Sequence, residues 1–532
     1  MLKLTNLRVA LEDERQLIKI AAKRLNIDCS FIKNLNILNK AVDARKKSNI
    51  SFVYSVLLEV ENEKKLLNRQ ATNKNLSVYA EEKSPQIVYG AEPLHGEVVV
   101  VGAGPAGLIS ALLLAQNGYK PILIERGLPV QERRNAVQKF WQKGEFSCQG
   151  NVQFGEGGAG TFSDGKLTTR VSSPAAKNIL KIFSSAGAPE EIAYENKPHI
   201  GTENLYTMTR NLSTQIKQAG GQIRYQAKLD DIITANGKLQ KVVLSDGSTI
   251  PCAALVIACG HSARDTYAML FDRGFELEAK PFSIGVRVEH PQNFIDTAQY
   301  GKFAGHAKLG AADYALVYHD KSSGRSAYSF CMCPGGVVVA SASEENQVVT
   351  NGMSYYKRNS GIANSALVVG VGTQDFGEHP LAGVAFQKKW EQLAFAKAGK
   401  NYFAPAQTVG SFLRDDTAVL GKLLQPSYRP GIAAVSLREV LPSFVTNTLA
   451  LALPQFGSKI KNFDHPEALL TGVETRTSAP LRILRDKESR QAIGKEGVYP
   501  AGEGAGYAGG IMSAAIDGYY TALALMKKYK QP

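Results

Sequence analysis

A glycine-punctuated stretch, VVVVGAGPAGLISALLLAQNGYKPILIE (98–125), constrains the fold more than any other part of the chain. It begins with four β-branched residues, as expected of a strand buried on both faces of a parallel sheet. Gly102, Gly104 and Gly107 follow in the GxGxxG spacing, and an apolar helix ends near Gly118. A second apolar strand closes on Glu125. Strand, glycine turn, helix, strand and acid together predict a doubly wound α/β sheet that binds a dinucleotide.

The three glycines have separate steric roles in such a unit. Gly102 permits a tight turn, Gly104 lets the backbone approach a pyrophosphate, and Gly107 lets the helix pack closely on the strand. The helix N-terminus offers free N–H groups and the positive end of its dipole to the phosphates. Glu125 is placed to accept hydrogen bonds from the adenosine ribose, and its charge disfavours a 2′-phosphate. We therefore expect an NAD-like nucleotide or FAD, and not NADP.

The later part of the sheet distinguishes between these two cofactors. A simple dehydrogenase would continue with short alternating strands and helices after Glu125. Here a long glycine-rich stretch follows instead. The sheet resumes only with a strand over 222–225, a hairpin through Asn236-Gly237 and an apolar strand that ends before Gly260. This interrupted order favours FAD.

Three segments resemble the glutathione-reductase-type flavoproteins, whose FAD domain is assembled from separated pieces. They are VVVVGAGPAGLISALLLAQNGYKPILIERG (98–127), ALVIACGHS (254–262) and VYPAGEGAGYAGGIMSAAIDG (498–518). The last segment has Glu503 where that superfamily usually has aspartate. A longer carboxylate can still accept a hydrogen bond from a ribityl hydroxyl.

A closer resemblance covers nearly the whole chain. Five blocks are similar to those of a bacterial family of FAD-dependent (NAD/FAD-utilising) dehydrogenases. They are FGEGGAGTFSDGKL (154–167), KPFSIGVRVEHPQ (280–292), YSFCMCPGGVVVASASE (328–344), VTNGMSYYKRNSGIANSA (349–366) and TGVETRTSAPLRI (471–483). The resemblance implies an FAD-dependent enzyme and leaves its substrate open.

The resemblance also implies which residues contact FAD. At the pyrophosphate it implies Gly102, Ala103, Gly104, Pro105, Ala106 and Gly107, with Gly260 nearby. At the adenosine it implies Glu125 on the ribose, Arg126 along the adenine, and the main chain of Leu229. At the ribityl chain and flavin ring it implies Gly502, Glu503, Gly509, Gly510 and Ile511.

The glycine-rich block 154–167 has two readings. We favour a loop that lies over the flavin, where bare backbone N–H groups stabilise the negative charge of the reduced ring. The alternative is a surface connector. In the first reading the contacts come from Gly157, Gly158, Thr161, Ser163, Asp164 and Lys166.

Catalytic candidates are sparse. His261 directly follows a buried strand, where ligands of open α/β sheets bind, and it could titrate near neutrality as an acid or base. The alternative for this stretch is a helix capped by Ser262 with a solvent-exposed Arg264. Arg476 suits an anionic substrate, although a structural ion pair explains it equally well. The catalytic candidates are therefore Lys166, His261 and Arg476. No catalytic triad or metal-ligand pattern is present in the sequence.

The chain divides into three expected domains. Residues 1–95 predict a ferredoxin-like α+β domain in which the polar stretch 62–86 is a surface excursion. Residues 96–274 with 491–532 form a three-layer, Rossmann-like FAD-binding domain. Residues 275–490 form an inserted substrate domain around an antiparallel or mixed sheet, with its clearest helix at 383–399. A second nucleotide domain is not expected, because Gly370 and Gly372 lack a third glycine and a following helix.

Composition adds further expectations. A net charge of +14 suits an anionic partner, although the basic residues are dispersed. Six scattered cysteines give no disulfide framework, and the CMC run at 331–333 is explained most simply by buried small residues. The chain shows neither a long apolar window nor a signal-peptide pattern, so we expect a cytoplasmic protein without a membrane span.

These observations predict an FAD-dependent oxidoreductase that acts on a small, anionic molecule, with NAD(P)H as a candidate transient reductant. A flavin-dependent tRNA-modifying enzyme is the first alternative, since the basic charge and the N-terminal domain are compatible with RNA. A non-catalytic flavin-binding protein is the second. Substrate and oligomeric state are not predicted.

Overall fold

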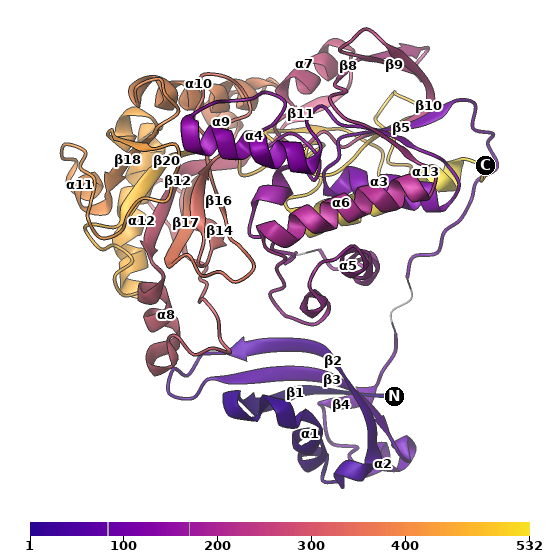
Figure 1. Ribbon diagram of the computed structural model, residues 1–532, viewed down its shortest axis with the longest axis vertical. Helices are drawn as coiled ribbons and strands as arrows, with labels where there is room; N and C mark the ends of the chain where they lie inside the picture. Colours follow the sequence, from indigo (N-terminus) through magenta and orange to yellow (C-terminus); the bar gives the residue numbers. More distant parts are fainter. Residues whose placement is uncertain (82–83, 170) are drawn as a thin grey trace.

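The computed structural model describes residues 1–81, 84–169 and 171–532. Its N-terminal part is a four-stranded antiparallel sheet whose two helices lie on the face turned away from the rest of the molecule (Figure 1). The elements are β1 (Leu2–Ala10), α1 (Leu17–Leu25), β2 (Ile32–Asp43), β3 (Ser51–Val60), α2 (Glu63–Arg69) and β4 (Leu76–Val78). The strand order β2-β3-β1-β4 confirms the ferredoxin-like fold.

One expectation for this part is wrong. Residues 62–86 are not a surface excursion, because they supply α2 and the edge strand β4, which pairs with β1. Leu66 and Leu76 are buried in the core, and their burial outweighs the polarity of the residues around them. Residues 82 and 83 of this stretch lie outside the described part of the chain.

The central sheet contains the glycine motif. Its parallel strands are β5 (Glu97–Val101), β6 (Ile122–Ile124), β7 (Gln222–Arg224), β10 (Thr249–Ile257) and β22 (Val498–Pro500). An antiparallel hairpin of β8 (Leu229–Ala235) and β9 (Lys238–Leu244) extends it from β10. The long β10 therefore joins the parallel part, which contains β22 from the far end of the chain, to the hairpin.

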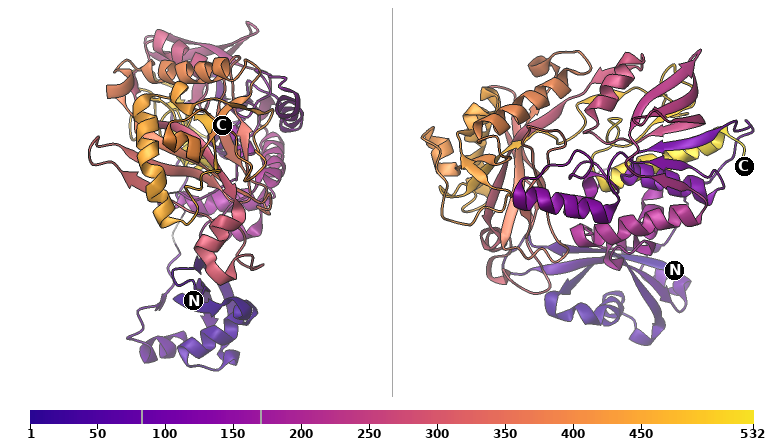
Figure 2. Two further views of the ribbon diagram at one scale, coloured as in Figure 1. Left: turned by 90° about the vertical axis from the view of Figure 1, so that its left-hand side faces the viewer. Right: turned by 45° about the horizontal axis from the view of Figure 1, so that its top comes forward.

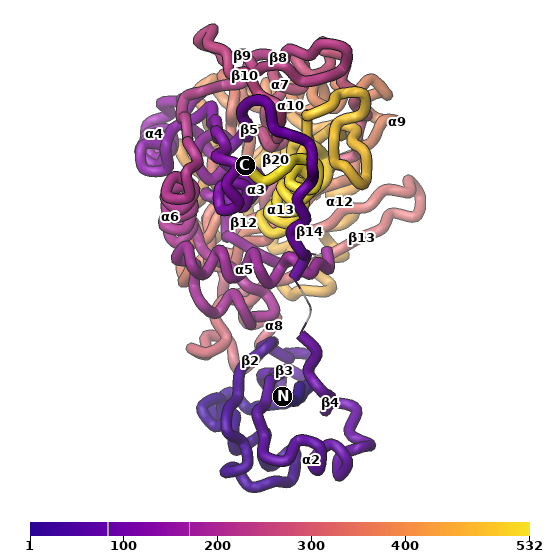
Figure 3. The backbone as a smooth tube through the Cα atoms, turned by 90° about the vertical axis from the view of Figure 1, so that its right-hand side faces the viewer, coloured from indigo at the N-terminus to yellow at the C-terminus, as the bar shows by residue number. Residues whose placement is uncertain are grey.

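Both faces of this sheet are covered, as the apolar run in β5 predicts. Val98 and Val100 pack in one hydrophobic core, while Val99 and Val101 pack in another on the opposite face. The first core includes α3 (Pro105–Gln116), α5 (Ala175–Ser185), α6 (Thr202–Gln218) and α13 (Ile511–Lys528). Figure 3 shows α3 beside α13, and Ser110 of α3 donates a hydrogen bond to Gly518 of α13, which lies 408 positions further along the chain.

The third sheet is mixed and mostly antiparallel, in the order β13-β14-β17-β12-β20-β18-β19. Its strands are β12 (Phe282–Pro291), β13 (Val317–His319), β14 (Ser326–Cys333), β17 (Ile362–Val371), β18 (Ala404–Thr408), β19 (Ile432–Ala434) and β20 (Leu469–Glu474). The helices α10 (Ala382–Lys397) and α12 (Ser443–Lys459) and the hairpin of β15 (Val337–Ala340) with β16 (Thr350–Met353) pack around it.

A helix does follow Gly372, contrary to expectation. It is the short α9 (Thr373–Phe376), and α10 comes soon after it. The preceding strand β17 nevertheless pairs antiparallel with both β12 and β14. This segment is therefore not a second dinucleotide-binding βαβ unit, which requires parallel strands.

The ferredoxin-like part contacts the rest of the chain through its strand β2. The backbone N–H of Lys40 donates to the carbonyl oxygen of Tyr194 at 2.8 Å, and the N–H of Asn196 donates back to Lys40 at 2.8 Å. The turned views in Figure 2 show this part below the two larger sheets. No described helix combines the length and apolar character that a membrane span needs.

Candidate functional site

A cavity of about 370 Å³ lies where the central sheet meets the mixed sheet. One end is formed by the loops after β5, β6 and β10, and the other by residues of β14, β16 and β20. Of the residues predicted for the site, all line this cavity except Ala103, Gly107, Gly157, Thr161 and Gly502. The structure therefore brings together segments that are separated by as many as 400 residues.

The five exceptions support the wall from behind. Gly107 lies under the turn, where a Cβ atom would come within 1.8 Å of the carbonyl oxygen of Gly102. The N–H of Gly157 donates to Ala103 at 2.7 Å, and the N–H of Gly502 donates to Asp517 at 2.7 Å. Packing therefore explains why residue 107 is glycine, and main-chain hydrogen bonds account for Ala103, Gly157 and Gly502. Direct contact with a cofactor is not needed to explain these residues.

Gly104 is different, because packing against the described residues does not explain why a glycine is needed there. A Cβ atom there would have only Gly158 near it, at 3.8 Å. Gly104 is also the N-cap of α3 and has no side-chain cap. The first turn of α3 therefore presents uncapped N–H groups to the cavity, as a pyrophosphate site requires.

Glu125 ends β6 and its carboxylate is buried beside the cavity. Oε1 accepts hydrogen bonds from the N–H groups of Gly127 (2.8 Å) and Gly155 (3.0 Å), and Oε2 accepts one from Ala103 (2.8 Å). An ionised carboxylate can accept about four such bonds. Oε2 therefore keeps acceptor capacity on the side where a ribose hydroxyl is expected.

Arg126 lies at the adenosine end of the cavity. Its guanidinium group forms a two-point ion pair with Asp265, at 2.8 and 3.0 Å, and stacks on the ring of Phe154 at 4.1 Å. These contacts hold the planar group flat. A flat guanidinium group is a suitable surface for an adenine ring.

The C-terminal glycine segment forms the other side of the cavity. Strand β22 ends at Pro500 and α13 begins at Ile511. Gly509 lines the cavity with an ordinary φ, and a Cβ atom there would meet no protein atom within 4 Å. Gly510 caps α13 with a φ of +131° and no side-chain cap. Backbone N–H groups and the helix dipole thus face the cavity.

Glu503 has no hydrogen-bonding partner for its carboxyl group within the described residues, although it is largely buried. Burial raises its pKa to about 7, against the opposing charge of Lys280 and with a further rise from Cys331. An unpartnered, buried carboxyl group facing a cavity is costly unless a ligand bonds it. This arrangement fits the ribityl hydroxyl that the resemblance implies.

The glycine-rich block 154–167 lines the cavity with Phe154, residues 158–160 and residues 163–166, and its other residues lie behind the wall. Asp164 forms a two-point ion pair with Arg358, at 2.9 and 2.6 Å. Burial works against its ionisation, but Arg358 outweighs burial and lowers the pKa. Lys166 donates from Nζ to the carbonyl oxygen of Met332, and none of the described carboxylates forms an ion pair with it. Lys166 is thus a cation with spare hydrogen-bond donors at the cavity.

His261 lines the cavity, but its predicted titration near neutrality is wrong. Burial and the charges of Arg476 and Arg264 lower its pKa to about 3, because a second positive charge is disfavoured there. The ring is therefore neutral at physiological pH, and its Nδ1 contacts the hydroxyl of Ser262 at 3.0 Å. These surroundings disfavour a protonated ring and therefore disfavour His261 as a general acid.

The alternative reading of this stretch is also wrong. The helix α7 (Arg264–Asp272) has Ala263 at its N-cap without a side-chain cap, so Ser262 does not cap it. Arg264 is only 5% exposed. Both of its Nη atoms bond the carboxylate of Glu391, at 2.9 and 2.8 Å.

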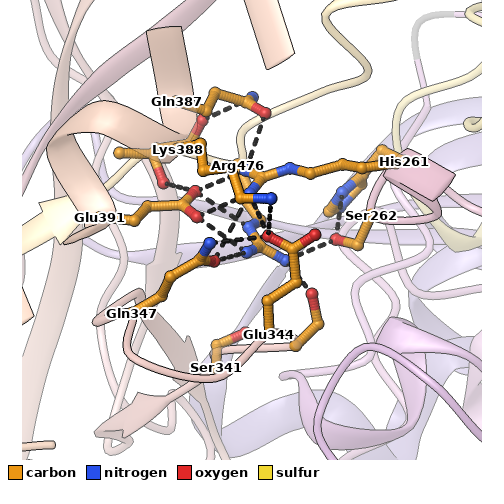
Figure 4. A network of polar contacts seen from close by, with 12 residues as sticks. His261, Ser262, Ser341, Glu344, Gln347, Gln387, Lys388, Glu391 and Arg476 are labelled. Carbon is orange, nitrogen blue, oxygen red and sulfur yellow. Dashed lines mark hydrogen bonds and ion pairs between the residues drawn. The ribbon is translucent and has the colours of Figure 1, made fainter. Parts of the chain in front are cut away.

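Arg476 belongs to the same network (Figure 4). All five of its N–H groups have protein acceptors: two on Glu391, and one each on Ser262, Ser343 and Gln347. No donor remains for a substrate, so the structural ion pair is the correct interpretation of this arginine. Despite burial, the two arginines lower the pKa of Glu391 to about 2.

A second saturated arginine was not found by sequence reasoning. Arg287 on β12 is fully buried and pairs with Glu474 at 2.8 and 3.0 Å. Its other donors reach the carbonyl oxygen of Cys331 and the side chains of Asn351 and Asn364. Cys331, Asn351 and Glu474 all line the cavity. Along β12, Arg287 shares the polar face of an alternating strand with Ser283 and Glu289. The sequence pattern therefore indicated neither its burial nor its partners.

Comparisons with known proteins agree with this site. Residues 96–266 match the family described as pyridine nucleotide-disulphide oxidoreductase, and residues 281–477 match FAD-dependent protein, C-terminal domain-like. Residues 1–59 match a domain of unknown function. An uncharacterized protein of Clostridium beijerinckii is 46% identical over 534 residues, covering 100% of this chain and 99% of its own.

Two solved structures are similar at lower identity. Glycine oxidase from Bacillus cereus is 13% identical and covers 82% of this chain and 99% of its own, with a TM-score of 0.32. GidA from Aquifex aeolicus is 13% identical and covers 82% of this chain and 64% of its own, with a TM-score of 0.36.

The fold and the site define an FAD-binding flavoprotein of the oxidoreductase class. Within that class, the chain belongs to the same bacterial family of FAD-dependent proteins as the clostridial protein.

Proposed function

We propose that the protein transfers hydride between N5 of bound FAD and a carbon atom of a small-molecule substrate. The observation that carries this proposal is a continuous cavity, which runs from the glycine motif after β5 to residues of β14, β16 and β20. Bound flavin supplies the redox chemistry, and the protein positions and polarises the reactants. We also propose that residues 275–490 act as the substrate domain.

The geometry supports one placement of FAD along this cavity. Gly104 and the first turn of α3 would hold the pyrophosphate, and Glu125, Arg126 and Leu229 would hold the adenosine. Glu503 would accept a hydrogen bond from the ribityl chain. Gly509 and the N-terminus of α13 would support the flavin ring, on which the helix dipole would favour a negative charge.

The substrate end of the cavity offers donors. Lys166 keeps spare N–H groups, and Asn351 uses Oδ1 to accept from Arg287 and from Gly352. The neighbouring carboxylates of Asp164 and Glu474 are each held by an arginine. Cationic and amide donors beside two carboxylates that are already paired support an anionic substrate, with Lys166 rather than Arg476 as its binding partner.

NADH or NADPH is the proposed reductant and would share the open flavin face with the substrate. The test is anaerobic mixing of the purified holoprotein with each nucleotide while the flavin absorbance is recorded. We expect one of them to bleach the flavin. Absence of bleaching by both would exclude this reductant, and a protein purified without any FAD would contradict the proposed function itself.

A further inference from the structure

A pair of thiols lies in the cavity wall on the side of the mixed sheet, and the proposed hydride transfer does not use it. Cys331 lines the cavity near the end of β14. Cys333, two positions along the same strand, is fully buried behind it. Both are free thiols in this structure.

The backbone at this pair is irregular, and the two sulfur atoms are close. The register of β14 against β17 shifts between Phe330 and Cys333, and Cys331 has a φ of +44°. The thiol of Cys333 donates to the carbonyl oxygen of Cys331 at 3.4 Å, and the two thiol groups also interact with one another. The irregular backbone therefore brings the thiol of Cys333 back toward Cys331, as the closure of a disulfide between them requires.

The surroundings make the two thiols unequal. The hydrogen bond from Cys333 lowers the pKa of the Cys331 thiol, and Arg287 and Lys166 lower it further against the effect of burial. Arg287 bonds the carbonyl oxygen of Cys331 at 3.0 Å, and Lys166 bonds that of Met332 between the cysteines. The pKa of Cys333 is raised by its bond to Cys331 and by burial. Cys331 is thus the thiolate and Cys333 the protonated partner.

This thiolate faces the part of the cavity where we place the flavin ring. Cys331 and Glu503 both line the cavity, and the charge on Cys331 contributes to the raised pKa of Glu503. Gly509 lines the same space from the start of α13. The thiolate and the flavin-binding segment therefore border one volume.

We propose that Cys331 and Cys333 form a dithiol–disulfide couple that exchanges two electrons with the FAD of the same chain. The inference rests on the proposed position of the flavin. On oxidation, a bond forms between the two Sγ atoms and Cys333 gives up its proton. The two electrons and this proton pass to oxidised FAD, which becomes the anionic reduced form FADH⁻. Atoms and charge balance without a further reactant, because Cys331 enters as a thiolate.

FAD accepts two electrons and the disulfide accepts two more, so the couple doubles the number of electrons that the oxidised protein accepts per FAD. Anaerobic titration of the air-oxidised holoprotein with dithionite, a two-electron reductant, measures this number directly. We expect two equivalents of dithionite per FAD for the unaltered protein and one for Cys333→Ser or Cys331→Ser. Cys148→Ser, which removes an exposed cysteine outside the cavity, is the control and should still take two.

A second readout does not depend on flavin absorbance or on the variants. Oxidised and dithionite-reduced samples are denatured, alkylated with iodoacetamide and digested, and the peptide with both cysteines is weighed. The couple predicts an unalkylated peptide lacking two hydrogens before reduction and a doubly alkylated peptide afterwards. One equivalent per FAD together with double alkylation in both states would overturn the inference while leaving the proposed function intact, since FAD would still be bound.

Discussion

Arg476 and Glu391 are joined by two hydrogen bonds in the protein interior, from Nε to Oε1 at 3.1 Å and from Nη2 to Oε2 at 2.9 Å. Arg264 at the start of α7 holds the same carboxylate from the FAD-binding side. Glu391 lies on α10 beside the mixed sheet. One buried carboxylate therefore ties the two halves of the cavity together.

Replacement of Glu391 should destabilise the protein strongly. Glu391→Gln removes the carboxylate shared by two buried guanidinium groups and leaves only Glu344, which pairs with Arg264 at 3.1 Å, as a nearby counter-charge. Breaking a buried pair costs about 3–5 kcal/mol in comparable cases. Urea denaturation followed by circular dichroism measures the change. The control is Glu439→Gln, which breaks the exposed 2.7 Å pair with Lys397 and should cost less than about 1 kcal/mol. Equal losses in the two variants would show that the network contributes no more than a surface pair.

The same carboxylate should make stability depend on pH in the acid range. The pKa of Glu391 is lowered from 4.5 to about 2, so its contribution is complete above pH 4.5 and is lost as the pH falls toward 2. The difference in stability between the unaltered protein and Glu391→Gln should therefore shrink over this interval. Thermal unfolding of both proteins at several pH values tests this, and a constant difference would contradict it.

A side chain at Gly509 should exclude the flavin without disturbing the fold. The Cβ atom of Gly509→Leu would have no atom of the described residues within 4 Å, and the position requires no left-handed backbone. Gly510, by contrast, has a φ of +131° and would be strained by any side chain. We expect FAD affinity to fall more than about tenfold, since even one displaced contact of about 1.4 kcal/mol is a factor of ten. The ratio of flavin to protein absorbance after gel filtration measures this.

The matched control for this variant is Gly370→Leu. Gly370 on β17 likewise has no atom near a Cβ and no positive φ, and it lies outside the cavity. It should keep the full yellow colour. Full occupancy in Gly509→Leu as well would mean that the flavin does not lie against this segment.

Glu503→Gln should stabilise the FAD-free protein in alkaline solution. The pKa of Glu503 is raised from 4.5 to about 7, so its ionisation opposes folding progressively between these values and fully above pH 7. The amide removes this penalty, which is roughly 3 kcal/mol for such a shift. Thermal unfolding of both apoproteins should show a gain at pH 8.5 that is largely absent at pH 5. The same variant should bind FAD more weakly, because it loses a carboxylate acceptor.

His261 should remain neutral throughout the physiological range. Its pKa of about 3 places the change of charge well below pH 5. In protein labelled with ¹⁵N-histidine, the imidazole resonances that disappear in His261→Asn should not shift between pH 5 and pH 9. A transition near pH 6.5 would restore His261 as a candidate acid or base.

Much of the cofactor site follows from local sequence patterns. The GxGxxG turn, the acid at the end of β6 and the glycines before α13 each act through their own backbone or immediate neighbours. Spacing alone therefore predicts them, because a turn, a helix start or a strand end is set within a few residues.

The chemistry of the charged residues depends instead on contacts between distant segments. Arg264 and Glu391 are 127 positions apart, and Arg476 and Ser262 are 214 apart. No local pattern indicates that these arginines neutralise one carboxylate, or that their charges keep His261 unprotonated. Desolvation and pairing are properties of a packed interior, so the roles of Arg476, His261 and Cys331 emerge only when the two sheets close around the cavity.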